Sequence, residues 1–279
     1  MSLNRSLQGR AKLVAEIGVQ VNEDSDQGWP PRHCCDTFTA HNRCPQHPQS
    51  CVVELRYRHS GSLGTQEEVY IALLGPGDYE YIAAFLVIVA AGAIVVPIYH
   101  ALPVSEALYY TKKVGAVAVL YSASCLKKGE ELGENLNATG NLTFQAINIR
   151  PLVLQELVPK DNLVISSTEY LDPNLLGLVI FTSGTTGPLK AAVIRRAYLN
   201  EIPLELEDLR DFKKDDCILH LLSVHRVTGI GVNILPFLFV GASIEFQGGQ
   251  FESRQTWERL RQGGVTVFSG VPTLYVRMM

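Results

Sequence analysis

One segment combines the groups needed to hold a phosphate-rich ligand. Residues 181–190 read Phe-Thr-Ser-Gly-Thr-Thr-Gly-Pro-Leu-Lys and follow an apolar stretch, 175–181, with the composition of a buried strand. Glycines allow a sharp turn in which several backbone N–H groups converge on one anion. Hydroxyl groups add hydrogen-bond donors, and a lysine adds a positive point charge. The segment therefore predicts a polyphosphate-binding loop.

A Walker A loop and a plain turn are the two alternatives to a polyphosphate-binding loop. The G-x-x-x-x-G-K-[ST] spacing of a Walker A loop is absent, so the segment is not a loop of that type. A plain Ser/Thr/Gly-rich turn between a strand and a helix would explain the glycines. It would explain neither the lysine nor the run of hydroxyl groups, and the phosphate-binding hypothesis is therefore preferred.

The elements expected around this loop alternate between strand and helix. Strands are expected at residues 69–74, 94–97, 117–121, 176–181, 217–222, 242–246 and 265–268. Helices are expected at residues 78–91, 103–113, within 193–209, at 229–240, at 254–261 and from 271 onward, with Asp78 as a helix N-cap. The polar residues 123–173 are expected to form a connecting region. Strands that alternate with helices predict parallel pairing and a three-layer α/β architecture.

The bulk composition indicates a globular α/β protein and excludes some partners. Of the 279 residues 47% are hydrophobic and 19% are charged, so a substantial buried core is expected. The net charge of −4 (24 basic minus 28 acidic residues) and the absence of a basic stretch give no indication of nucleic-acid binding. Residues 82–98 are apolar, but they are slightly short for a membrane span and include Gly92 and Pro97. A buried helix followed by a buried strand, with no transmembrane segment, is expected there.

Residues 1–67 show no sustained periodicity and are expected to form an irregular N-terminal arm before the domain at 68–279. The first residues lack the apolar core of a secretory signal, so an intracellular, reducing location is expected. The basic residues among the first 15 give this segment a weak resemblance to a mitochondrial transit peptide, so both the cytosol and the mitochondrion are expected as alternative locations. A zinc site at His41, Cys44, His47 and Cys51 is the alternative function for the arm. Paired C-x2–4-C hooks are missing, so solvated side chains and no metal site are expected.

The loop at 181–190 resembles the phosphate-binding signature of the adenylate-forming, or AMP-binding, enzymes: acyl-CoA synthetases, luciferases and nonribosomal peptide adenylation domains. The family pattern is [YF]-T-S-G-[ST]-T-G-x-P-K-G. The matching residues are Phe181, Thr182, Ser183, Gly184, Thr185, Thr186, Gly187 and Lys190. Leu189 stands where proline is usual, and Ala191 replaces the final glycine.

Three further stretches resemble the same family, so that the resemblance covers about residues 69–279. Residues 79–97 resemble its helix, glycine turn and strand, and residues 267–275 resemble its V-P-T-x-Y segment. Residues 219–230 resemble L-x-x-L-P-L-x-H-x-x-G, with His225 and Gly229 at the key positions. The resemblance is nearest to the malonyl-CoA-synthetase-like type, although Arg226 and Thr228 replace two histidines of its H-H-V-H-G motif.

The resemblance implies ATP-dependent activation of a carboxylic acid to an acyl-adenylate, followed by transfer to CoA, with Mg²⁺ as the metal cofactor. It implies that Thr182, Ser183, Thr185, Thr186 and Lys190 contact the β- and γ-phosphates, and that Gly184 and Gly187 permit close backbone approach. Lys190 and His225 would be the catalytic residues, with His225 bordering the carboxylate and the α-phosphate. A purely structural His225 is the alternative.

The family's later motifs are not found in this sequence. They include Y-G-x-[TS]-E, a ribose-binding aspartate, a hinge motif and a late catalytic lysine. The chain is therefore expected to be a truncated, N-terminal portion that does not complete the reaction alone, with a complementary C-terminal half as a possible partner. A non-catalytic nucleotide-binding remnant or scaffold is the alternative function.

Overall fold

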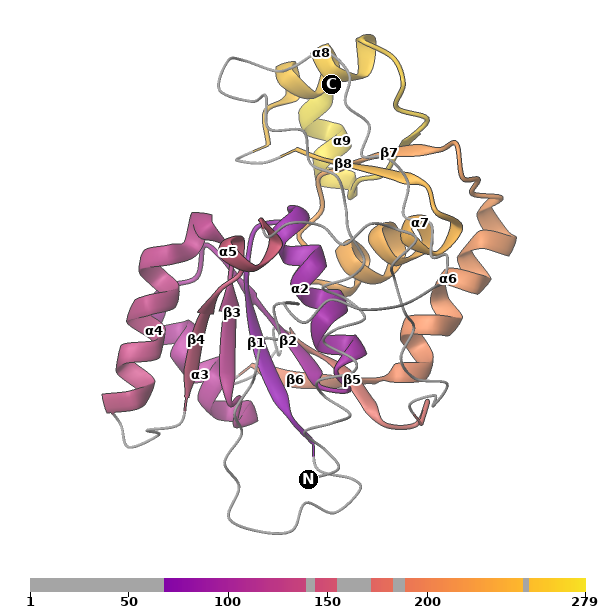
Figure 1. Ribbon diagram of the computed structural model, residues 1–279. Coiled ribbons are helices and arrows are strands. Elements are labelled where there is room, and N and C mark those ends of the chain that lie inside the picture. The colour runs from indigo at the N-terminus through magenta and orange to yellow at the C-terminus, as the bar shows by residue number, and fades with distance from the viewer. Residues whose placement is uncertain (1–67, 139–143, 155–171, 183–188, 248–250) are drawn as a thin grey trace. The chain divides into compact units, whose positions relative to one another are not determined.

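The computed structural model describes residues 68–138, 144–154, 172–182, 189–247 and 251–279 (Figure 1). The arm at residues 1–67, with its histidines and cysteines, lies outside these ranges. The described chain divides into two compact units, the first running to Tyr198 and the second from Leu199 to Met279.

A six-stranded sheet forms the centre of the first unit, in the order β4-β3-β1-β2-β5-β6. The strands are β1 (Tyr70–Gly75), β2 (Ile94–Tyr99), β3 (Ala118–Tyr121), β4 (Gln145–Asn148), β5 (Leu176–Thr182) and β6 (Lys190–Arg195). Strands β1 to β5 are parallel to their neighbours, which confirms the predicted pairing. Strand β6, which is not among the expected strands, is antiparallel to β5.

Helices cover both faces of this sheet, which gives the predicted three layers. The helical elements are α2 (Tyr79–Ala90), α3 (Val104–Val114), the 3₁₀ turn η1 (Ala123–Cys125), α4 (Leu126–Ala138) and α5 (Arg150–Val153). Ala72 and Leu74 of β1 pack in one core cluster with Ala107 of α3 and with Leu132 and Leu136 of α4. The alternate β1 residues, Ile71 and Leu73, point to the opposite face and are fully buried there, where α2 contacts β1 and β2.

The apolar run at 82–98 folds as the sequence predicts. It forms most of α2 and β2, and Asp78 caps the helix by accepting a hydrogen bond from the backbone N–H of Tyr81 at 2.8 Å. Within the described ranges, none of the helices combines the length and the hydropathy required to span a bilayer.

The expectation of a mere connecting region at 123–173 is wrong. Its described part contains η1, α4, β4 and α5. Helix α4 presents Leu132 and Leu136 to the core, while Gly129 and Gly133 let it approach the sheet closely. The two glycines and the charged residues of its exposed face obscure the helical pattern in the sequence, because glycine is a poor helix former.

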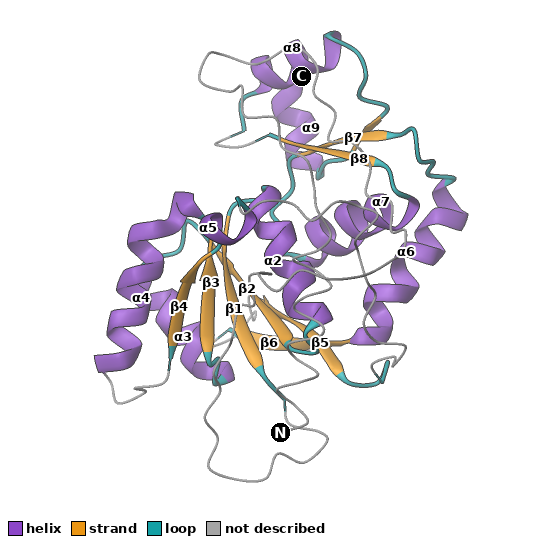
Figure 2. Cartoon of the chain, viewed as in Figure 1, coloured by secondary structure: helices purple, strands orange, loops and turns teal. Residues whose placement is uncertain are grey.

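The second unit has a smaller parallel sheet in the order β8-β7-β9. Figure 2 shows its strands β7 and β8. Its strands are β7 (Cys217–His220), β8 (Ser243–Phe246) and β9 (Val267–Phe268). Its helices are most of α6 (Arg196–Arg210), the π-helical η3 (Thr228–Ile234), α7 (Leu235–Val240), α8 (Ser253–Arg261) and α9 (Pro272–Met278). Pro236 lies in the first turn of α7, where the π-helical η3 passes directly into an α-helix.

Candidate functional site

The predicted phosphate loop is the connection of a β-hairpin. Thr182, the last residue of β5, pairs with Lys190, the first residue of β6, and the Thr182 hydroxyl donates a hydrogen bond to the Lys190 carbonyl at 3.3 Å. The structure therefore brings these two predicted site residues together. The other five, Ser183, Gly184, Thr185, Thr186 and Gly187, lie outside the described residues.

The position of this hairpin in the sheet suits a ligand site. Because β1 to β5 are parallel, their carboxyl ends share one edge of the sheet, and Thr182 lies at that edge. Ligands of open α/β sheets bind outside this edge. Just before Thr182, the ring of Phe181 stacks on Tyr110 of α3 with a centroid separation of 4.2 Å and an interplanar angle of 12°. This stack holds the end of β5 against the body of the unit.

The Lys190 side chain is exposed, and among the described residues no carboxylate forms an ion pair with it. Its ammonium group is therefore placed to meet an anion from solvent. The exposed Thr182 hydroxyl and the loop's two glycines fit the same kind of ligand, since phosphate oxygens accept from hydroxyl, ammonium and backbone N–H donors.

His225 lies in the second unit, in a tight turn after β7. The backbone N–H of Arg226 donates to the Ser223 carbonyl at 3.1 Å, and that of Gly229 donates to the Arg226 carbonyl at 3.1 Å. A Cβ atom on Gly229 would lie 2.3 Å from the Ser223 carbonyl oxygen. Only glycine fits there, so Gly229 of the motif shapes the turn that carries the half-buried His225. The β5–β6 hairpin belongs to the first unit and His225 to the second. The position of His225 is therefore described only relative to the second unit.

A second histidine, His220, is more deeply buried than His225, and no pattern in the sequence singles it out. It is the last residue of β7, is 2% exposed, and meets the ring of Phe246 edge to face at 5.5 Å. Neither ring nitrogen makes a hydrogen bond of ordinary geometry with the described residues. Burial lowers the pKa of His220 to about 4, against a smaller opposing effect from the Leu222 backbone. The imidazole is neutral near pH 7.

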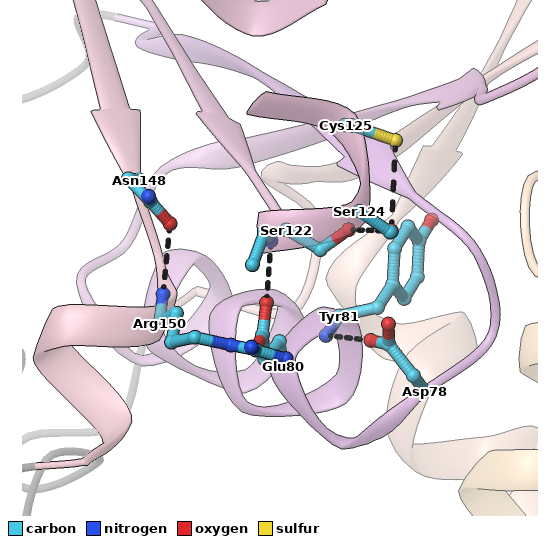
Figure 3. A network of polar contacts seen from close by, with 9 residues as sticks. Asp78, Glu80, Tyr81, Ser122, Ser124, Cys125, Asn148 and Arg150 are labelled. Carbon is cyan, nitrogen blue, oxygen red and sulfur yellow. Dashed lines mark hydrogen bonds and ion pairs between the residues drawn. The ribbon is translucent and has the colours of Figure 1, made fainter. Parts of the chain in front are cut away.

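The sheet edge also carries a polar network that the sequence analysis missed (Figure 3). Glu80 of α2 is buried, and both of its carboxylate oxygens have partners. Oε1 lies 2.7 Å from Nε of Arg150, and Oε2 accepts from the backbone N–H of Ala123 at 2.7 Å. The network thus joins the segments that follow β1, β3 and β4.

Asp78 adds a second carboxylate to this network. Burial raises the pKa of Asp78 to about 6, and the negative charge of Glu80 acts in the same direction. The hydrogen bond from the Tyr81 N–H and the charge of Arg150 act in the opposite direction. The described residues contain no group of three or more histidine, cysteine, aspartate or glutamate side chains able to hold a metal ion. The network therefore has a structural role: it links the segments that follow β1, β3 and β4.

The family model described as AMP-binding enzyme matches residues 60–279. A CoA ligase of Gibberella moniliformis is 29% identical over an alignment of 236 residues, with 75% of this chain and 38% of the relative covered. A mitochondrial malonate–CoA ligase of Mus musculus is 25% identical over 234 residues, with 82% of this chain and 39% of the relative covered. The chain therefore spans about two fifths of the length of these curated relatives.

Solved structures show the same fold. Apo MatB from Rhodopseudomonas palustris superimposes with a TM-score of 0.65 at 19% identity, covering 98% of this chain and 45% of that one. A malonyl-CoA ligase in a ternary product complex with methylmalonyl-CoA and AMP gives a TM-score of 0.60 at 26% identity, covering 74% of this chain and 40% of that one.

Proposed function

From the premise that this chain belongs to the AMP-binding enzyme family, we propose that its β5–β6 hairpin holds the phosphates of Mg·ATP while a carboxylic acid is activated. The observation that carries the proposal is the pairing of Thr182 with Lys190, which closes the ends of the glycine- and hydroxyl-rich loop at the carboxyl edge of the sheet. Activation of this kind depends on positioning and on neutralising phosphate charge.

Each side chain has a defined part in this proposal. Lys190 supplies a positive charge to the β- and γ-phosphates, and the hydroxyl groups of Ser183, Thr185 and Thr186 donate to the phosphate oxygens. The Thr182 hydroxyl joins them by turning its single hydrogen from the Lys190 carbonyl to a phosphate oxygen. Gly184 and Gly187 permit the backbone to come close. His225 borders the carboxylate and the α-phosphate. Mg²⁺, when bound, neutralises phosphate charge, and CoA accepts the acyl group in the second step.

We further propose that the acid is a small dicarboxylate such as malonate. The support is that malonate–CoA ligases are among the relatives and that a malonyl-CoA ligase is among the solved structures with this fold. An intracellular location, in cytosol or mitochondria, belongs to the same proposal, and the mouse relative is by its name mitochondrial.

Exchange of labelled pyrophosphate into ATP tests the proposal. We expect no exchange from this chain alone, and exchange that depends on an added carboxylate, malonate included, when a complementary C-terminal half is present. Lys190→Ala should abolish it. Nucleotide binding without exchange even in the presence of that half would favour the second candidate, a nucleotide-binding scaffold. Exchange that persists in Lys190→Ala would contradict the assigned role of the loop.

A further inference from the structure

A buried arginine lies at the base of the hairpin, at the end opposite to the loop. Arg196 follows β6 directly and is 5% exposed. Its Nη1 donates to the carbonyl of Val89 at 3.0 Å, and its Nη2 donates to the carbonyl of Ala93 at 2.9 Å. These partners belong to the last turn of α2 and to the turn that leads into β2, both far from Arg196 in the sequence.

The C-terminus of α2 explains why a cation is buried there. The last carbonyls of a helix have no partner within the helix, and they form the negative end of its dipole. The last turn of α2 contains no basic residue of its own. Arg196 supplies the missing charge, and the two carbonyls in turn accept from Nη1 and Nη2 of a guanidinium that would be costly to bury without acceptors. The contact therefore stabilises both partners.

The hairpin needs such an anchor because its backbone pairing to the rest of the sheet is short. Strands β1 and β2 pair in continuous register over their whole length, whereas Val95–Leu178 is the one register pair between β2 and β5 in the described chain. The backbone N–H of Arg196 also donates to the Leu175 carbonyl at 2.8 Å, which closes the base of the hairpin.

We propose that Arg196 is a positioning residue for the phosphate loop. By binding α2 it fixes the register of β6 against β5, and so the place where Lys190 meets Thr182. A slip of one residue would turn Lys190 to the opposite face of the sheet. The neighbouring Arg195 cannot substitute, because it is the last residue of β6 and its side chain is exposed. The link to phosphate binding rests on the proposed function, but the link to hairpin register does not.

Hydrogen–deuterium exchange on the full chain tests the register claim without any ligand. Arg196→Met keeps the length of the side chain and removes both donors, and Arg196→Lys keeps the charge. We expect faster exchange in β5 and β6 for Arg196→Met, less change for Arg196→Lys, and no change in β1 or β3. The matched control is Arg254→Met, because the Arg254 side chain is 88% exposed. Unchanged exchange in β6 of a folded Arg196→Met chain, or an equal rise in every strand, would overturn the proposal.

Two further measurements keep the test decisive. If the variants do not fold, exchange of the unsubstituted chain in increasing urea should show β6 and the end of α2 losing protection together. Early opening of β6 alone would contradict an anchored hairpin. For folded variants, titration with Mg·ATP should give at least a roughly tenfold weaker affinity for Arg196→Met and an unchanged affinity for Arg254→Met. An unsubstituted chain that binds no Mg·ATP refutes the proposed function, while the exchange data still decide the role of Arg196.

Discussion

At the scale of single residues, His220 makes the stability of the fold depend on pH. An ordinary histidine has a pKa near 6.5, and burial lowers that of His220 to about 4. Below pH 6.5 the unfolded chain therefore binds a proton that the folded chain does not bind until about pH 4. The folded state loses stability through this window, and the linkage amounts to about 2 kcal/mol between pH 7.5 and pH 5.

Urea unfolding of the native chain and of His220→Leu at these two pH values measures this loss. The substitution should make unfolding less sensitive to pH by about that amount, because leucine carries no titrating group into the same apolar site. Taking the difference between the two chains removes the contribution of the other histidines. An equal pH dependence in both chains would show that His220 is not buried in its neutral form.

Some of the residues discussed above can be identified from the sequence alone, and others cannot. Thr182 and Lys190 could be selected because several suitable residue types cluster in one short loop, and the structure pairs them. His220 and Arg196 could not, since a single histidine or arginine has no characteristic spacing. Their importance comes from burial and from contacts with segments far away in the sequence.

At the scale of elements, strong local patterns made most of the fold predictable. The apolar runs of β1, β2 and β5 and the capped helix α2 were predicted because these elements are buried and show clear periodicity. Strand β6 was missed because it lies at the edge of the sheet and exposes most of its side chains. Helix α4 and strand β4 were missed because their stability comes from packing on the sheet rather than from local propensity.

The close packing of α4 against the sheet at Gly129 leads to a testable prediction. A Cβ atom on Gly129 would lie 2.3 Å from the ring of Tyr121, a buried side chain at the end of β3. Alanine favours a helix by about 1 kcal/mol over glycine. Overpacking of a core costs about 1–3 kcal/mol. The ring has little room to move, so Gly129→Ala should destabilise the protein by about 1 kcal/mol.

Urea unfolding measures this change, and Glu131→Ala is the control in the same helix. Glu131 is exposed, so its replacement should change the free energy of unfolding by no more than about 0.5 kcal/mol. A Gly129→Ala chain more stable than the native one would mean that helix propensity outweighs the close approach of α4 to Tyr121.

At the scale of the whole molecule, we propose that the folded domain begins near residue 68. Deletion of residues 1–67 should then leave the free energy of unfolding within about 0.5 kcal/mol of the full chain, and Mg·ATP affinity unchanged. Because the family match begins at residue 60, a deletion of residues 1–59 is the matched comparison. Loss of stability in the longer deletion alone would move the boundary toward residue 60, and loss in both would place the arm within the fold.

The central claim concerns the whole chain as a nucleotide-binding protein, with the hairpin as the place where phosphate is held. Its most direct test is calorimetric titration of the 279-residue chain with Mg·ATP, beside Lys190→Ala and the control Lys127→Ala. Lys190 and Lys127 are both exposed, so neither substitution should change the fold. The account predicts binding by the native chain and by Lys127→Ala, with an affinity at least about tenfold weaker for a folded Lys190→Ala. Equal affinity in all three chains, or no binding by the folded native chain, would contradict it.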